Sequence, residues 1–291
     1  MSDFIERPSR RALLTGLAVS PIAVAGIGSF SGTARAQAQA AGLISPNVCM
    51  VMPEVTEGPY YLDEQLVRAD ITEDREGVPM RLRLQVVTAD CTPVEGARVD
   101  VWHCDAVGNY SGYATQGSDG TNDTSEQSFL RGTQMTGADG VAEFRSIYPG
   151  WYRGRTTHVH YKVFLDERTV LTSQIFFPDA LSQYLFQSVA PYNDRSGAER
   201  DTMNSNDGIA KQAGEGAYAA IREQYDYYDA ALVVGIDPEA TSSESGMGAG
   251  GPAGGPPTSG ERPDGPPPDG MGGPQEGVAA EVFIPGRTAT E

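Results

Sequence analysis

A regular alternation of apolar and polar residues over four short segments constrains the fold most strongly. The segments lie at residues 82–90, 97–105, 140–147 and 158–166, and each is rich in Val, Ile, Phe or Tyr. A period of two residues is typical of β-strands with one buried face. Clusters of Gly, Pro or Asp flank the segments, as expected where turns join strands. The pattern therefore predicts a chain built mainly from short strands.

Residues 171–177 and 228–237 are two further expected strands, and residues 208–225 are the one helix candidate. Many short strands followed by a single helix favour an all-β fold. We expect an antiparallel β-sandwich core with long loops and one late short helix. A length of about 200 residues suits one domain of this kind, which we place at residues 42–238.

Both ends of the chain are expected to lie outside this domain. Residues 1–36 begin with basic residues that include Arg10 and Arg11, continue with an apolar run, and end in an Ala-Arg-Ala site. Because the run is shorter than the roughly 20 apolar residues of a membrane span, this order indicates a twin-arginine-type export signal that is removed. Residues 239–291 are predicted to be a disordered tail, because 20 of the 33 residues at 245–277 are Gly or Pro.

The export signal predicts a periplasmic or extracellular protein, and the charge and the cysteines indicate what such a protein can bind and form there. The net charge is −18, and 17 basic against 37 acidic residues remain without residues 1–36. Such a surface repels nucleic acids and anionic membranes, so neither is expected as a partner. Outside the cytoplasm we expect one disulfide among Cys49, Cys91 and Cys104, with one thiol left over. The sequence favours no particular pairing.

Two of the three histidines in the chain, His158 and His160, are one residue apart in the segment YRGRTTHVHY. On a strand both imidazoles project from the same face, about 7 Å apart along the chain, and can bind one metal ion. An H-x-H pair is also typical of two hydrogen-bonded histidines on a half-buried strand. No Cys or acidic residue stands at zinc-site spacing, and no H-E-x-x-H motif is present.

Tyrosines, in contrast, are frequent around this pair, at Tyr110, Tyr113, Tyr148, Tyr152 and Tyr161. A phenol has a pKa of about 10 and binds as phenolate only where a strong Lewis acid removes its proton. Anionic oxygen together with imidazole suits ferric iron better than zinc or copper(I). A site of two histidines and two tyrosines is therefore expected to hold one non-haem Fe(III) ion, Fe(3+), per chain.

Three blocks of the chain resemble a known family. The segment FLRGTQMTGADGVAEFRSIYPGWYRGRTTHVHYKV (129–163) closely resembles the intradiol ring-cleavage dioxygenases, which include the catechol and protocatechuate dioxygenases. VDVWHCDAVGNYSGY (99–113) and TEGPYY (56–61) resemble two further blocks of that family, in the same order. The WHCD and YPGWY variants resemble its exported branch most.

The resemblance implies an oxidoreductase that uses O₂ and ferric iron. It implies cleavage of a catechol-type ring between its two hydroxylated carbons, with both oxygen atoms incorporated into a muconate-type diacid. The implied substrates are catechol, protocatechuate, hydroxylated hydroquinones or lignin-derived catechols. Members of the family often form homodimers.

The resemblance also implies roles for individual residues. Tyr110 and Tyr152 match the two iron tyrosines, and Tyr152 is the axial ligand that leaves when substrate binds. His158 matches the axial imidazole, and His160 matches the equatorial one. Arg155 matches an arginine that faces the bound ring, so Arg155 and Tyr152 are the implied catalytic residues.

The remaining implied pocket residues are Gln174, in the next expected strand, and Pro59 and Tyr60, at the substrate mouth. The third histidine, His103, follows Trp102 on the opposite strand face and is expected to be structural or to support the ligands. We expect Tyr113 and Tyr148, two of the remaining tyrosines, to be packing residues.

Two other functions are compatible with an exported β-sandwich. A binding module for sugars or aromatic ligands would hold no metal and take up no oxygen. A hydrolase would pair His158 or His103 with a serine nucleophile, but the chain has no G-x-S-x-G motif. Both alternatives are less compatible with the full set of two tyrosines, two histidines, an arginine and a glutamine.

Overall fold

Eight strands form the body of the protein in the computed structural model, which describes residues 49–117, 120–195 and 199–243. The expected segments of alternating polarity are all strands. The strands are β1 (Pro79–Thr88), β2 (Arg98–Trp102), β3 (Arg131–Met135), β4 (Val141–Ile147), β5 (His158–Leu165), β6 (Arg168–Phe176), β7 (Ala220–Glu223) and β8 (Tyr228–Ile236).

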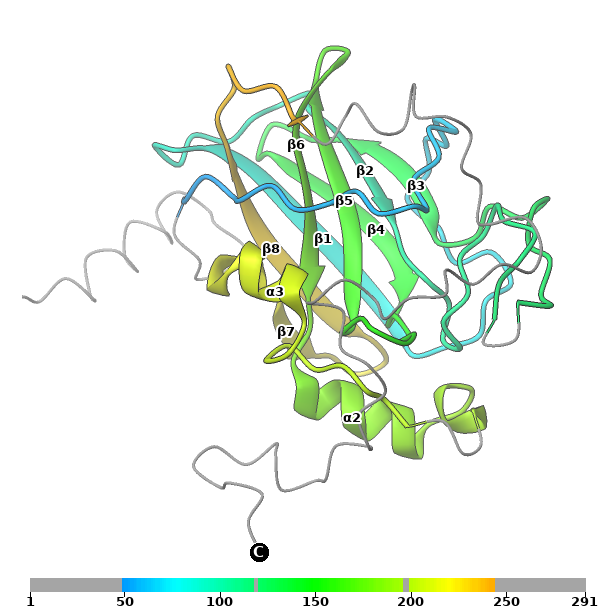
Figure 1. Ribbon diagram of the computed structural model, residues 1–291. Helices are drawn as coiled ribbons and strands as arrows, with labels where there is room; N and C mark the ends of the chain where they lie inside the picture. The colour runs from blue at the N-terminus through cyan, green and yellow to red at the C-terminus, as the bar shows by residue number, and fades with distance from the viewer. Residues whose placement is uncertain (1–48, 118–119, 196–198, 244–291) are drawn as a thin grey trace, which may run out of the picture.

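The strands form two four-stranded sheets, which pack as a sandwich (Figure 1). The first sheet has the order β4-β1-β8-β7, and the second has the order β3-β2-β5-β6. Every pair is antiparallel except β1 with β8, which is parallel. The expected all-β sandwich is therefore confirmed, with one parallel pair inside it.

Strand β5 shows how the alternating pattern is used. Val159, Tyr161 and Val163 point into the apolar core between the sheets, and each is fully buried. The residues between them point to the outer face of the second sheet, yet His158 and His160 are buried as well. Both faces of this sheet are therefore covered, and its outer face is the polar one.

The helices differ from the sequence expectation. The segment 208–225 is helical only in α3 (Gly208–Ala213), and Gly214, with a φ of 73°, ends that helix. A 3₁₀ turn (Glu215–Ala217) and strand β7 occupy the rest. A second helix, α2 (Asp179–Ser188), was not expected, because its ten residues bury only Ser182, Leu185 and Phe186 and carry a weak apolar pattern.

The ends of the domain are attached by covalent and polar contacts. The disulfide joins Cys49 to Cys91, and Cys104 is the buried free thiol. The first five residues of the expected tail, 239–243, are part of the fold, since Ser242 N donates to Thr169 O at 2.9 Å. The expected signal at 1–36 and the rest of the tail lie outside the described residues.

Within the described residues, no helix is long and apolar enough to span a membrane.

Candidate metal centre

Two phenols and two imidazoles converge on the outer face of the second sheet. His158 and His160 come from β5, while Tyr110 and Tyr152 come from the loops after β2 and β4. His158 Nε2 lies 3.0 Å from His160 Nε2, 3.1 Å from Tyr152 Oη and 3.4 Å from Tyr110 Oη. The two phenol oxygens are 3.5 Å apart. The structure thus brings together all four residues that the sequence resemblance assigned to iron.

Close approach of two loops places the tyrosines. A Cβ atom on Gly150 would lie 2.3 Å from the carbonyl oxygen of Asp105, so only glycine lets the Pro-Gly turn pack against that loop. The Asp105 carboxylate in turn accepts from Asn109 N at 2.8 Å. Tyr110 N donates to the side-chain oxygen of Gln116 at 2.9 Å. These contacts hold the backbone on both sides of the Tyr110 ring.

The histidine rings are oriented by their neighbours. Nδ1 of His158 donates to the carbonyl oxygen of Thr156 at 2.6 Å, which leaves the lone pair of Nε2 facing the other donors. His160 stacks on Trp102, with ring centroids 4.9 Å apart and planes at 11°. Trp102 and Gln174 are the residues paired with His160 on its two neighbouring strands. The sheet register therefore fixes the place of the His160 ring.

The donor set fits a metal ion better than a hydrogen-bonded cluster. His158 Nε2 has one lone pair but four polar neighbours at 3.0–3.4 Å, including Nη1 of Arg155. At metal–donor distances of about 2.0–2.2 Å, as found for zinc, adjacent donors stand about 2.9–3.5 Å apart. In the described part of the chain, no three His, Cys, Asp or Glu side chains could hold a metal ion. The two tyrosine oxygens complete the donor set, and anionic oxygen together with imidazole favours ferric iron.

Burial governs the ionisation of these four groups. It raises the pKa of the Tyr110 and Tyr152 phenols, and for Tyr110 the nearby Tyr152 acts in the same direction. Burial also lowers the pKa of His158 and His160. Protein groups alone therefore keep all four side chains neutral, and the charge of a bound cation is what would make the phenols ionise.

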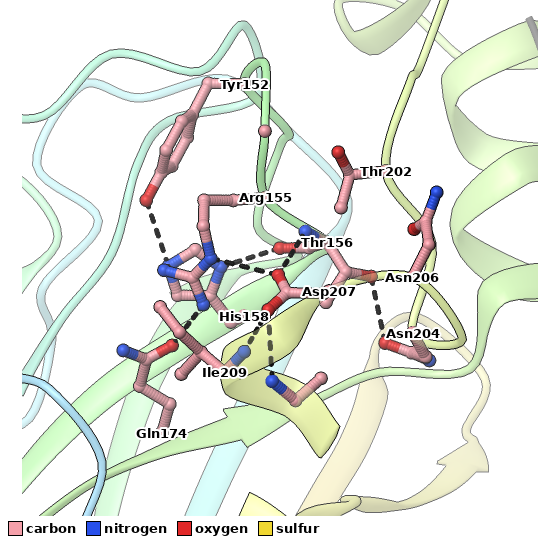
Figure 2. A network of polar contacts seen from close by, with 12 residues as sticks. Tyr152, Arg155, Thr156, His158, Gln174, Thr202, Asn204, Asn206, Asp207 and Ile209 are labelled. Carbon is pink, nitrogen blue, oxygen red and sulfur yellow. Dashed lines mark hydrogen bonds and ion pairs between the residues drawn. The ribbon is translucent and has the colours of Figure 1, made fainter. Parts of the chain in front are cut away.

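Arg155 lies beside the donors and is held on two sides (Figure 2). Its Nε donates to Asp207 Oδ2 at 2.9 Å, and its Nη2 donates to Gln174 Oε1 at 2.5 Å. Nη1 lies 3.4 Å from His158 Nε2. Gln174 in turn donates to the carbonyl oxygen of Thr56 at 2.8 Å. The expected pocket residues Arg155 and Gln174 are therefore adjacent to the centre and to each other.

The segment that contains Pro59 and Tyr60 covers the centre. The Tyr60 ring stacks on Tyr110 with centroids 4.3 Å apart and planes at 15°. Pro59 is exposed and contributes only its carbonyl oxygen, which accepts from Tyr113 Oη at 3.0 Å. Tyr60 is thus part of the centre's wall, whereas Pro59 lies at its outer rim.

Three residues that support the centre were not identified from the sequence. Trp102 stacks on His160, and the strand pattern gave it no role in the site. Buried Arg131 donates to the carbonyl oxygens of Tyr60 and Ser111. Asp207 holds Arg155 from 52 residues further along the chain. No local pattern links such distant residues, and a polar residue before a helix was the only signal for Asp207.

His103 and Tyr148 have the structural roles that we expected. His103 Nδ1 donates to the carbonyl oxygen of Cys104 at 2.8 Å, and its Nε2 accepts from Ser146 Oγ at 2.7 Å. The buried Tyr148 hydroxyl lies 2.8 Å from Ser182 Oγ, away from the four donors. Tyr113 packs edge-on against Tyr60.

Comparison with known proteins identifies the family. A family model described as "Dioxygenase" matches residues 53–207, which is just over half of the chain. An intradiol ring-cleavage dioxygenase from Tetranychus urticae has a solved structure that superposes with a TM-score of 0.61 at 34% identity. The match covers 67% of this chain and 98% of that one. The chain belongs to the intradiol ring-cleavage dioxygenase family.

The match to curated relatives covers only part of their length. Catechol 1,2-dioxygenase 1 of Acinetobacter lwoffii is 31% identical in a match that covers 42% of this chain and 45% of that protein. A catechol 1,2-dioxygenase of Acinetobacter baylyi is 28% identical in a match that covers 64% of each chain. The chain spans about half the length of most of the curated relatives that it matches.

The buried His103 predicts a pH dependence of stability. Burial lowers the pKa of His103 to about 4, whereas an unfolded histidine titrates near pH 6.5. The unfolded state therefore binds a proton that the folded state excludes, and stability falls as the pH drops from 6.5 to about 4. In urea unfolding, His103→Gln should reduce this loss by up to about 1.4 kcal/mol per pH unit. Equal pH slopes for the variant and the wild type would contradict this.

Proposed function

We propose that the protein is a non-haem, Fe(III)-dependent dioxygenase that cleaves a catechol-type ring between its two hydroxylated carbons. O₂ is the second substrate, and a muconate-type diacid is the product. The observation that carries the proposal is the convergence of two phenols and two imidazoles, which are linked by four contacts of 3.0–3.5 Å. Relatives named catechol, chlorocatechol and hydroxyquinol 1,2-dioxygenases support the substrate class.

Tyr110, Tyr152, His158 and His160 would hold the iron. When bound there, ferric iron would supply Lewis-acid chemistry that makes a catechol ring reactive towards O₂. The two tyrosines differ in exposure, because Tyr110 is fully buried and Tyr152 is only half-buried. Tyr152 is therefore the one that an incoming substrate can reach and displace.

Four side chains around the centre have separate roles towards the substrate. Tyr152, as the phenolate that a bound cation would produce, would accept one of the two protons that a catechol must lose. Arg155 presents Nη1 towards the donors, where a positive charge stabilises negative charge on the ring. Gln174 holds the guanidinium from β6, and Tyr60 provides an aromatic wall beside Tyr110. Burial of the centre limits the access of bulk water to these groups.

The iron ligands can be tested by substitution. Tyr110→Phe and His160→Ala each remove a donor, so the affinity for iron should fall by more than about 100-fold, because even outer-shell partners contribute about 10–100-fold. Metal analysis and the visible phenolate-to-iron absorption band measure this loss. Tyr148→Phe, at a buried tyrosine away from the centre, is the matched control. It should keep both the bound iron and the absorption band. A wild-type protein that takes up no ferric iron and shows no band would disprove the metal site.

The catalytic role of Arg155 can be tested separately from iron binding. Arg155→Ala should retain iron and colour but lower kcat about 10²–10³-fold, as expected for the loss of one charge-stabilising donor. Oxygen uptake with a panel of catechols measures turnover, and mass spectrometry identifies the diacid. Arg153→Ala removes an exposed arginine two residues away and should leave kcat unchanged. Full activity in Arg155→Ala would contradict the role assigned to Arg155.

We also propose that the protein is exported through its N-terminal segment. The Cys49–Cys91 disulfide supports an oxidising compartment. Expressed in a bacterium with a twin-arginine pathway, the periplasmic protein should begin near Gln37, as measured by N-terminal sequencing. Replacing Arg10 and Arg11 together by lysine should keep the protein in the cytoplasm. An uncleaved N-terminus on the wild-type protein would contradict removal of the signal.

A further inference from the structure

The two oxygens of the Asp207 carboxylate bind two different parts of the chain (Figure 2). Oδ1 accepts from the backbone N–H groups of Ile209 at 2.8 Å and Ala210 at 3.0 Å, and so caps the N-terminus of α3. Oδ2 accepts from Arg155 Nε and from the backbone N–H of Thr156, both at 2.9 Å. Asp207 itself is buried, with 2% of its surface exposed.

The contact with Asp207 determines how Arg155 faces the centre. A guanidinium is planar, so bonds to two of its nitrogens fix the direction of the third. Nε is bound by Asp207 and Nη2 by Gln174. Nη1 is thereby left on the side of the donors, 3.4 Å from His158 Nε2. Without Asp207, only Gln174 would hold the guanidinium, and rotation about that single contact would move Nη1.

Oδ2 of Asp207 also supports the start of β5. It accepts from the N–H of Thr156, and the carbonyl oxygen of Thr156 accepts from Nδ1 of His158. The Thr156 hydroxyl donates to Asn204, which lies three residues before Asp207. The 204–207 segment therefore holds the backbone between Arg155 and His158 from the side of α3.

The charge of Asp207 is suited to this position. Burial alone would raise the pKa of the carboxyl, but Arg155 and the backbone donors hold that pKa below its ordinary value. The carboxylate is therefore ionised at neutral pH. Its four hydrogen bonds satisfy both oxygens, so a buried charge at this position is stabilised rather than costly.

We propose that Asp207 is the positioning residue of Arg155: it fixes the guanidinium with Nη1 directed at the iron-binding donors, in addition to capping α3. This inference rests on the proposed function, in which Arg155 stabilises charge on the substrate. A residue that only capped the helix would affect stability and leave turnover unchanged.

The test separates the two tasks of the carboxylate. Asp207→Ser keeps an oxygen that can cap α3, since serine is as good a cap as aspartate, but it cannot reach Arg155. The iron-loaded variant should keep its colour. Its kcat should fall at least about tenfold, because a small displacement of a catalytic group slows the reaction strongly. Asp207→Asn, which places an amide beside Arg155 Nε, should show a loss in the same direction.

Two further variants test whether the loss of kcat in Asp207→Ser is transmitted through Arg155. If Asp207 acts through Arg155, the double variant Arg155→Ala/Asp207→Ser should be no slower than Arg155→Ala alone. Lys211→Gly, at an exposed position in α3, should lower Tm without changing kcat. A kcat of Asp207→Ser equal to that of the wild type, or a double variant in which the two losses multiply, would overturn the proposal.

A readout that needs neither iron nor turnover distinguishes this inference from the proposed function. Phenylglyoxal modifies accessible arginines, and peptide mass mapping gives its rate at Arg155. Release of Nε should raise that rate several-fold in Asp207→Ser and leave it unchanged in Lys211→Gly. An inactive, iron-free wild type would defeat the proposed function even if this rate rises. An unchanged rate in Asp207→Ser, with an active wild type, would defeat only the role of Asp207.

Discussion

The burial of the polar outer face of the second sheet is the constraint on which the rest of the structure depends. His158, His160 and Lys162 project from β5 on this face, and each is at least 97% buried. A buried polar group without a partner costs about 1–3 kcal/mol, so each of these side chains requires one. Lys162 has Glu57, in an ion pair that is almost completely buried. The His158 imidazole contacts both tyrosine hydroxyls and the His160 imidazole, and together these four groups are better satisfied by a cation than by one another.

Polar contacts also hold the segment that covers this face. Residues 53–62 are fixed at Glu57 by Lys162, at Thr56 by Gln174, and at Tyr60 by Arg131. Such buried, directional contacts specify one position for the cover, whereas apolar packing alone would tolerate small shifts. The Tyr60 ring is consequently stacked on Tyr110, and the centre is enclosed on the side of the TEGPYY segment.

The strands of the core were predictable because their alternation of polarity is local. The missed elements lack that signal. Strand β3 is an edge strand whose sequence, RGTQM, is mostly polar, and β7 is a four-residue edge strand inside the expected helix. In the site, period two correctly placed His158 and His160 on one face. Choosing Tyr110 and Tyr152 among five tyrosines required the family resemblance, because spacing along the chain does not tell which loops meet.

The sequence by itself determined the all-β fold, the paired histidines and the type of metal that two phenols and two imidazoles favour. These follow from side-chain chemistry and from a two-residue period of polarity. Both signals can be recognised within a few consecutive residues. Only the tertiary structure decided that Trp102 stacks on His160, that Arg131 holds Tyr60, and that Asp207 holds Arg155. Those contacts join segments 52 to 71 residues apart, and they exist because the sheet register and the loop packing bring the segments together.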